Sequence, residues 1–101
     1  MRRRVDRSTY RPYTARMMIR VEEYGEGREA RRTAIKEAID VSLLNAGATV
    51  SIDGSNEELA AVRLVLAGRA GERTLVSDGL LYEGVEEAGG EVWTILVCED
   101  D

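Results

Sequence analysis

The stretch from residue 17 to residue 53, MMIRVEEYGEGREARRTAIKEAIDVSLLNAGATVSID, contains three hydrophobic patterns in succession. Apolar residues first alternate with polar ones from Met17 to Val21, which is typical of a half-buried strand. They then recur at helical spacing over residues 28–45, and alternation returns over residues 48–53. The stretch therefore predicts a strand, a long helix and a second strand.

A second helix is predicted to begin at Ser55. The Ser55 hydroxyl can accept a hydrogen bond from the backbone N–H of Glu58, while the Glu58 carboxylate reaches back to the N–H of Ser55, which is a capping box. The helix continues to about Ala67 and is apolar around nearly its whole circumference, so we expect it to be covered on more than one side, with a second subunit as one cover. The interface of the expected homodimer is assigned to Leu59, Val62 and Leu66.

The remainder of the chain predicts three strands. Residues 74–77 and 80–83 flank Asp78 and Gly79, a pair suited to the positive φ angles of a type I′ hairpin turn. An alternative makes Asp78 the N-cap of a short helix. Residues 92–98 are almost continuously apolar, which is typical of a central strand covered on both faces.

The order strand, helix, strand, helix, strand, strand, strand indicates the α+β class. We expect one mixed or mostly antiparallel sheet of four or five strands with both helices packed on one face. The length of 101 residues suits a single domain, assigned to residues 15–98. Residues 1–14 form a basic N-terminal arm and residues 99–101 an acidic tail.

The composition excludes several kinds of chemistry. The chain contains no histidine, so a histidine base, a histidine-ligated metal and an imidazole pH switch are excluded within one chain. The single cysteine, Cys98, cannot form an internal disulfide, and no apolar run is long enough for a membrane span or a signal peptide. We therefore expect a cytoplasmic protein that is not an enzyme, binds no cofactor or metal and does not contact a membrane.

The charges are distributed unevenly along the chain. Residues 1–20 hold seven arginines against one aspartate, a net charge of +6, whereas residues 21–101 hold seven basic and eighteen acidic residues, a net charge of −11. An acidic body is attracted to basic surfaces, including those with which other proteins hold nucleic acid. The candidate partner-binding residues of the body are Glu22, Glu26 and Glu29, and those of the arm are Arg2, Arg3, Arg4, Arg7, Tyr10, Arg11 and Tyr13.

These observations lead to one main hypothesis, a non-enzymatic protein-binding module whose acidic body engages a basic partner surface. Its specific form is a small inhibitor of a nucleic-acid-binding machine, as phage proteins of the anti-CRISPR kind are, although no motif ties the chain to such a family. The first alternative is a nucleic-acid-associated factor, because arginine forks fit phosphates and tyrosine rings stack on bases. The arm is equally suited to docking on this chain's own acidic body or on that of a neighbouring subunit.

A second alternative is a small-ligand or nucleotide-binding domain. Gly25 and Gly27 follow the first predicted strand in a G-x-G-x-x-A pattern, and Asp53 ends the next strand, as in a dinucleotide-binding unit. Glutamates crowd the turn in which a diphosphate would sit, and their charge opposes the binding of an anion. The pattern is therefore more consistent with an ordinary turn between a strand and a helix.

Overall fold

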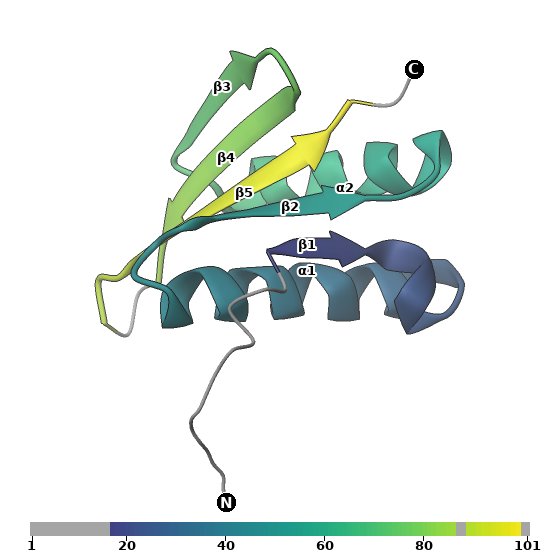
Figure 1. Cartoon of the computed structure of the whole chain (residues 1–101), viewed down its shortest axis with the longest axis horizontal. Helices are drawn as coiled ribbons and strands as arrows, with labels where there is room; N and C mark the ends of the chain where they lie inside the picture. Colours follow the sequence, from purple (N-terminus) through teal and green to yellow (C-terminus); the bar gives the residue numbers. More distant parts are fainter. Residues whose placement is uncertain (1–16, 87–88, 100–101) are drawn as a thin grey trace, which may run out of the picture.

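The computed structural model describes residues 17–86 and 89–99. The described chain forms one sheet and two long helices, and Figure 1 shows that the sheet is twisted. The elements in chain order are β1 (Met18–Arg20), the 3₁₀ helix η2 (Val21–Tyr24), α1 (Gly27–Leu44), β2 (Thr49–Asp53), α2 (Asn56–Arg69), β3 (Glu72–Val76), β4 (Gly79–Val85) and β5 (Val92–Cys98).

The five strands form one mixed sheet in the order β1-β2-β5-β4-β3. β1, β2 and β5 are parallel to one another, whereas β4 is antiparallel to β5 and β3 is antiparallel to β4. The predicted α+β class and element order are confirmed. The parallel part arises because α1 connects β1 to β2 in a crossover, and the antiparallel part arises because β3, β4 and β5 follow one another as a meander.

Both helices pack on the same face of the sheet. One row of that face runs through Ile19, Ile52 and Val97 on three neighbouring strands, and all three side chains are fully buried. The cluster of buried residues that forms the core is Ile19, Val21, Ala34, Ile35, Ala38, Ile39, Val50, Ile52, Leu59, Val62, Leu66, Tyr82, Trp93, Ile95 and Val97.

The first strand is shorter than predicted. Alternation favoured a strand through Val21, but β1 ends at Arg20 and the chain turns into η2. Val21 remains fully buried, so the change of conformation keeps the apolar residue in the core. Gly25 then ends η2 with a φ of 107°, a value that residues with a Cβ rarely adopt.

The capping box that starts α2 is present, and the described residues cover only one side of this helix. The N–H of Glu58 donates to Ser55 Oγ at 3.2 Å, and the N–H of Ser55 donates to Glu58 Oε1 at 2.8 Å. Only one stripe of α2 is buried, while Leu64 is 78% and Val65 is 43% exposed. In a domain with one sheet, each helix packs its apolar side against that sheet. The opposite side of the helix then faces outward, even when it is also apolar.

β5 lies at the centre of the sheet as predicted, and described elements cover only one of its two faces. Its buried apolar residues Trp93, Ile95 and Val97 face the helices, and no described element lies over the opposite face of the sheet. We call that opposite face the open face. By the strand register, its residues are Met18, Arg20, Thr49, Ser51, Asp53, Glu72, Thr74, Val76, Gly79, Leu81, Glu83, Val85, Val92, Thr94, Leu96 and Cys98.

The predicted hairpin joins β3 to β4, but its turn lies one residue earlier than expected. Val76 pairs with Gly79, so Ser77 and Asp78 form the loop, and neither has a positive φ angle, which rules out a type I′ turn. Gly79 instead begins β4 at a φ of 151°. A Cβ at this position would clash with the carbonyl oxygen of Val97, so glycine is required by the close approach of β4 to β5.

A buried serine connects the end of α1 to the sheet. Ser42 has no exposed surface, and its hydroxyl donates to the carbonyl oxygen of Ala48 at 2.7 Å. The same oxygen accepts a hydrogen bond from the backbone N–H of Thr94 at 2.9 Å. Ser42 thereby joins α1, the loop before β2 and the central strand β5.

Candidate functional site

The topology brings the carboxyl ends of several strands to the same edge of the sheet. β1, β2 and β5 are parallel, and β3 runs in the same direction because β4 is antiparallel to both β3 and β5. The segments that follow these four strands are therefore neighbours along one edge. We call this the acidic edge, and its carboxylates are Glu22, Glu23, Glu26, Asp53, Glu57, Glu58, Asp78 and Glu99.

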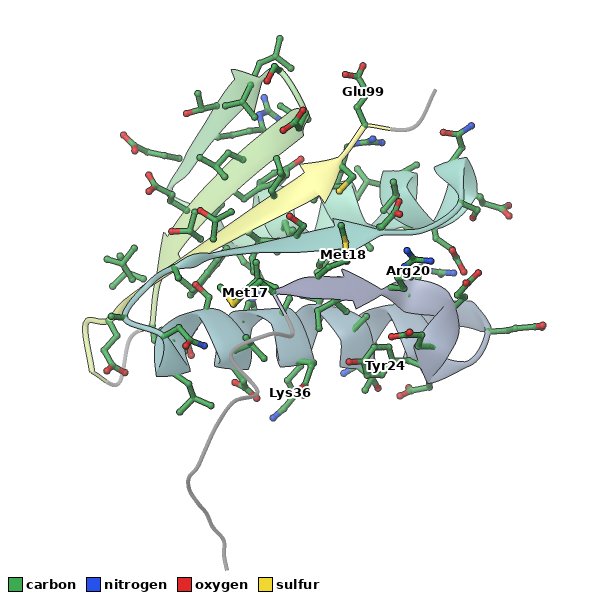
Figure 2. The ribbon with its side chains drawn as sticks, in the orientation of Figure 1. Met17, Met18, Arg20, Tyr24, Lys36 and Glu99 are labelled. Carbon is green, nitrogen blue, oxygen red and sulfur yellow. The ribbon has the colours of Figure 1, made fainter. Side chains whose placement is uncertain are left out.

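The connection between β1 and α1 contributes the first part of the acidic edge. Glu22, Glu23 and Glu26 are all exposed. Two cations accompany them, Arg20 at the end of β1 and Arg28 in the first turn of α1. Figure 2 shows Arg20 where β1 passes into η2.

Glu29, also predicted as a partner-binding residue, lies one turn along α1. Its Oε2 is 3.8 Å from Arg32 Nη1, and both side chains are largely exposed. Glu29 therefore lies beside the acidic edge, with a cation of its own helix as a neighbour.

The junction of β2 and α2 contributes the second part. Asp53 Oδ1 accepts a hydrogen bond from the N–H of Gly54 at 2.8 Å, which fixes the carboxylate at the end of β2. Glu58 is held by the capping box, and Glu57 is exposed beside it. Carboxylates in the first turn of a helix are stabilised by the helix dipole, so their negative charge favours the fold as well as a basic partner.

The hairpin loop and the end of β5 contribute the third part. The N–H of Glu99 donates to the carbonyl oxygen of Asp78 at 2.9 Å, which holds these two acidic residues together. Burial raises the pKa of the neighbouring Cys98 thiol, and the carboxylates of Asp53 and Asp78 raise it further. The Cys98 thiol thus experiences the negative field of two separate loops.

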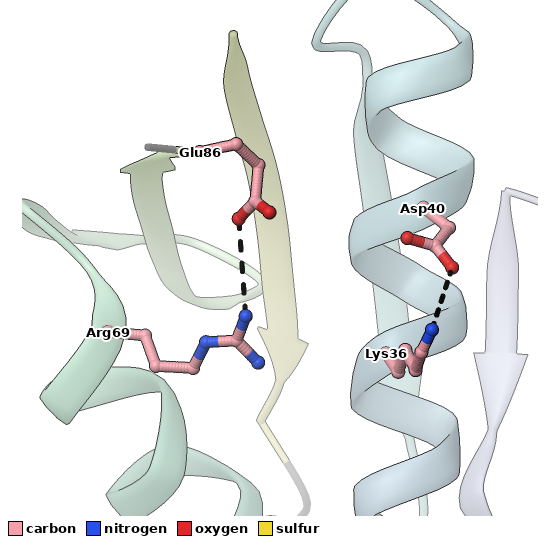
Figure 3. Close-up of polar contacts among 4 residues, drawn as sticks. All are labelled: Lys36, Asp40, Arg69 and Glu86. Atoms are coloured by element: carbon pink, nitrogen blue, oxygen red, sulfur yellow. Dashed lines mark ion pairs between the residues drawn. The ribbon is translucent and has the colours of Figure 1, made fainter. Parts of the chain in front are cut away.

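A second surface feature is a groove of about 410 Å³ between α1 and α2. Figure 3 shows two of its ion pairs: Lys36 Nζ lies 3.9 Å from Asp40 Oδ2, and Arg69 Nη2 lies 4.0 Å from Glu86 Oε2. Each cation in these pairs has a carboxylate close to it. The groove therefore has no excess of either sign with which to select a charged ligand.

The structure does not support a diphosphate site at Gly25 and Gly27. The 3₁₀ helix η2 separates β1 from these glycines, so they do not form the tight turn directly after the strand that a dinucleotide-binding unit uses. Asp53 Oδ1 accepts the N–H of Gly54, and Glu22, Glu23 and Glu26 directly precede α1. Within residues 17–86 and 89–99, no cluster of carboxylates and thiols has the composition to hold a metal ion.

The predicted interface residues Leu59, Val62 and Leu66 have no exposed surface, because α2 turns them toward its own sheet. They are therefore not available to a second subunit in this fold. None of the residues assigned to the homodimer interface lies on the surface, and the homodimer stays a prediction. The arm residues Arg2, Arg3, Arg4, Arg7, Tyr10, Arg11 and Tyr13 lie outside the described residues, so the nucleic-acid hypothesis remains a prediction.

Sequence reasoning identified Glu22 and Glu26 but missed Asp53, Asp78 and Glu99 as parts of the same surface. The signal was available in principle, because Asp53 ends a predicted strand and Asp78 and Glu99 each directly follow one. To use this signal, the direction of every strand must be known. The order of helices and strands does not say whether β3, β4 and β5 run parallel or antiparallel to β1 and β2.

Neither helix of the described chain combines the length and the apolar character needed to cross a membrane. Comparison with protein-family models, with curated proteins and with solved structures finds no significant match to this chain.

Proposed function

We propose that this chain is a non-enzymatic protein-binding module whose acidic edge engages a basic surface of another protein. The observation that carries the proposal is the gathering of eight carboxylates along one edge, from four segments that are separate in the sequence. Within the described part of the chain, Arg20 and Arg28 are the cations that lie among them. A surface with one dominant sign of charge attracts a partner of the opposite sign from a distance and repels wrong partners.

The structure also provides rigidity for such a surface. Asp53 is fixed by its bond to Gly54, Glu58 by the capping box, and the backbone of Glu99 by Asp78. Charges held in place before binding lose less conformational entropy when the partner arrives. The acidic edge is therefore suited to a specific contact as well as to general attraction.

The specific form of the proposal is inhibition of a nucleic-acid-binding protein. Carboxylates spaced along an edge present negative charge to the arginines and lysines that would otherwise contact phosphates. A module of this kind competes with the nucleic acid for the same basic surface.

The test uses two double variants with the same net charge. Glu22→Lys with Glu57→Lys reverses two charges on the acidic edge, whereas Glu37→Lys with Glu91→Lys reverses two exposed charges away from it. Proteins captured from a lysate of the source organism by the wild type and by each variant are compared by quantitative mass spectrometry, and the candidates are purified for binding measurements.

The proposal predicts a purified partner whose affinity falls about tenfold or more, ~1.4 kcal/mol, with the edge variant and changes little with the control variant. Equal losses with both variants would mean that only net charge matters and would overturn the proposal. The inhibitor form requires in addition that the partner's nucleic acid displaces the module, and simultaneous binding of both would refute that form alone. Circular dichroism verifies that both variants are folded.

A further inference from the structure

The open face of the sheet is apolar at its centre. The strand register places Met18, Ser51, Leu96, Leu81 and Thr74 side by side in one row across all five strands. No described helix or loop lies over this row, since α1 and α2 both pack on the opposite face. The sheet therefore presents the apolar side chains of Met18, Leu81 and Leu96 on a face that no described element covers.

Several large apolar side chains of the open face are exposed. Val85 is 58%, Val92 is 47% and Met18 is 42% exposed, and Leu81 and Leu96 at the centre of the face are half-buried. Val85 and Val92 are direct partners on β4 and β5, so their exposed surfaces are continuous. The pair formed by Leu81 and Leu96 lies further along the same two strands, beyond Glu83 and Thr94. Exposed apolar side chains gathered on one face can mark a place at which another segment or protein binds.

The open face also carries an excess of negative charge. Asp53, Glu72 and Glu83 lie on it against the single cation Arg20, a net charge of −2. The acidic edge borders the same face, with Asp53 and Asp78 near Cys98. An occupant that complements this surface must supply both apolar groups and positive charge.

Residues 1–16, the arm together with the two residues that join it to the described chain, have this combination. They include six arginines against Asp6, a net charge of +5, together with Val5, Tyr10 and Tyr13. A nucleic acid would be repelled by the carboxylates, and a second copy would bring the same net negative face. The arm is therefore the occupant whose chemistry fits best.

The connection of the arm to β1 also favours this occupant. The carbonyl oxygen of Met17 accepts a hydrogen bond from the N–H of Ser51 at 2.8 Å, so the chain enters the sheet at an edge strand beside the open face. Sixteen extended residues span up to about 50 Å, whereas five strands spaced ~4.8 Å apart are about 20 Å across. The arm is long enough to cross the face, and its tether keeps it at an effective concentration of roughly millimolar.

We infer that residues 1–16 fold back on their own chain and cover the open face, with tyrosines and Val5 against Leu81 and Leu96, and arginines at the surrounding carboxylates. Arginine forks match carboxylate oxygens in a bidentate geometry, and tyrosine rings bury apolar area while keeping the hydroxyl in water. The inference concerns the free protein and does not depend on the proposed partner.

The test measures the distance between the arm and the open face in the full chain. Ser8→Cys is introduced in a Cys98→Ser background and labelled with a nitroxide, which broadens the NMR signals of nearby methyl groups. The open-face reporters are the methyl groups of Leu81 and Leu96. The matched controls are Leu44 and Leu64, which are 82% and 78% exposed on the helices.

The expected result is that the Leu81 and Leu96 signals lose most of their intensity while the control signals keep theirs. A second variant replaces the arm arginines Arg2, Arg3, Arg4, Arg7 and Arg11 with glutamine and is expected to restore the open-face signals. Equal broadening of all four leucines, or none, would overturn the inference. A second sample mixes spin-labelled chains without isotope with isotope-enriched chains without the label. Broadening of Leu81 and Leu96 in this mixture would come from the arm of another molecule, and it would assign the face to a second copy instead.

Discussion

Replacing Ser42 with alanine tests how α1 is fastened to the sheet. The Ser42 hydroxyl has two partners at once, the carbonyl oxygen of Ala48 and the backbone N–H of Thr94. Thr94 lies on the central strand and is 7% exposed, so water cannot readily replace the lost acceptor. Alanine at position 42 therefore leaves a buried backbone N–H without a partner.

The magnitude follows from the two bonds. An unsatisfied buried donor costs about 1–3 kcal/mol. Losing the hydrogen bond to the carbonyl oxygen of Ala48 costs less, because Ala48 is half-buried and a water molecule can reach that oxygen. Alanine regains roughly 0.5 kcal/mol from its higher helix propensity. We expect a loss of ~2 kcal/mol in the free energy of unfolding, which lowers the Tm by roughly 10 °C in a domain of this size.

The assay is urea unfolding followed by the fluorescence of Trp93, the only tryptophan of the chain, which is 1% exposed in the folded state. The matched control is Ser51→Ala, at a half-buried serine of the open face, with an expected change within about 0.5 kcal/mol. Ser42→Cys, which keeps a weaker donor and acceptor, is expected to lie between wild type and alanine. Equal stability of Ser42→Ala and Ser51→Ala would refute the role of the Ser42 hydroxyl.

Two further predictions concern the other face of β4 and the thiol at the end of β5. Gly84→Ala places a methyl group where the Trp93 ring lies, so we expect a loss of about 1–3 kcal/mol in urea unfolding; unchanged stability would show that the ring can move aside at no cost. Asp53→Asn removes a carboxylate that raises the pKa of Cys98, so the thiolate fraction at a fixed pH near 8 rises and alkylation by uncharged iodoacetamide becomes faster. The control Asp40→Asn, on the outer side of α1, should leave the alkylation rate unchanged, and an equal response of both variants would contradict the assigned cause.

Local sequence rules determined the elements of this fold. The capping box of Ser55 and Glu58 fixed the start of α2 because both hydrogen bonds close within one helical turn. The Asp78-Gly79 pair located the hairpin between β3 and β4 to within one residue. The α+β order of helices and strands followed from these short-range patterns.

Tertiary structure alone decided which surfaces remain exposed and which charges meet. The apolar circumference of α2 and the apolar run of β5 both predicted cover on two sides, yet Leu64 and Val65 are exposed and the open face has no described cover. Hydrophobic periodicity reports which residues can be buried, whereas burial requires a second element to lie against them. In the same way, Asp53 and Asp78 approach Cys98 only because β2, β3 and β5 run in one direction, and strand direction is set by long-range pairing that no short stretch of sequence encodes.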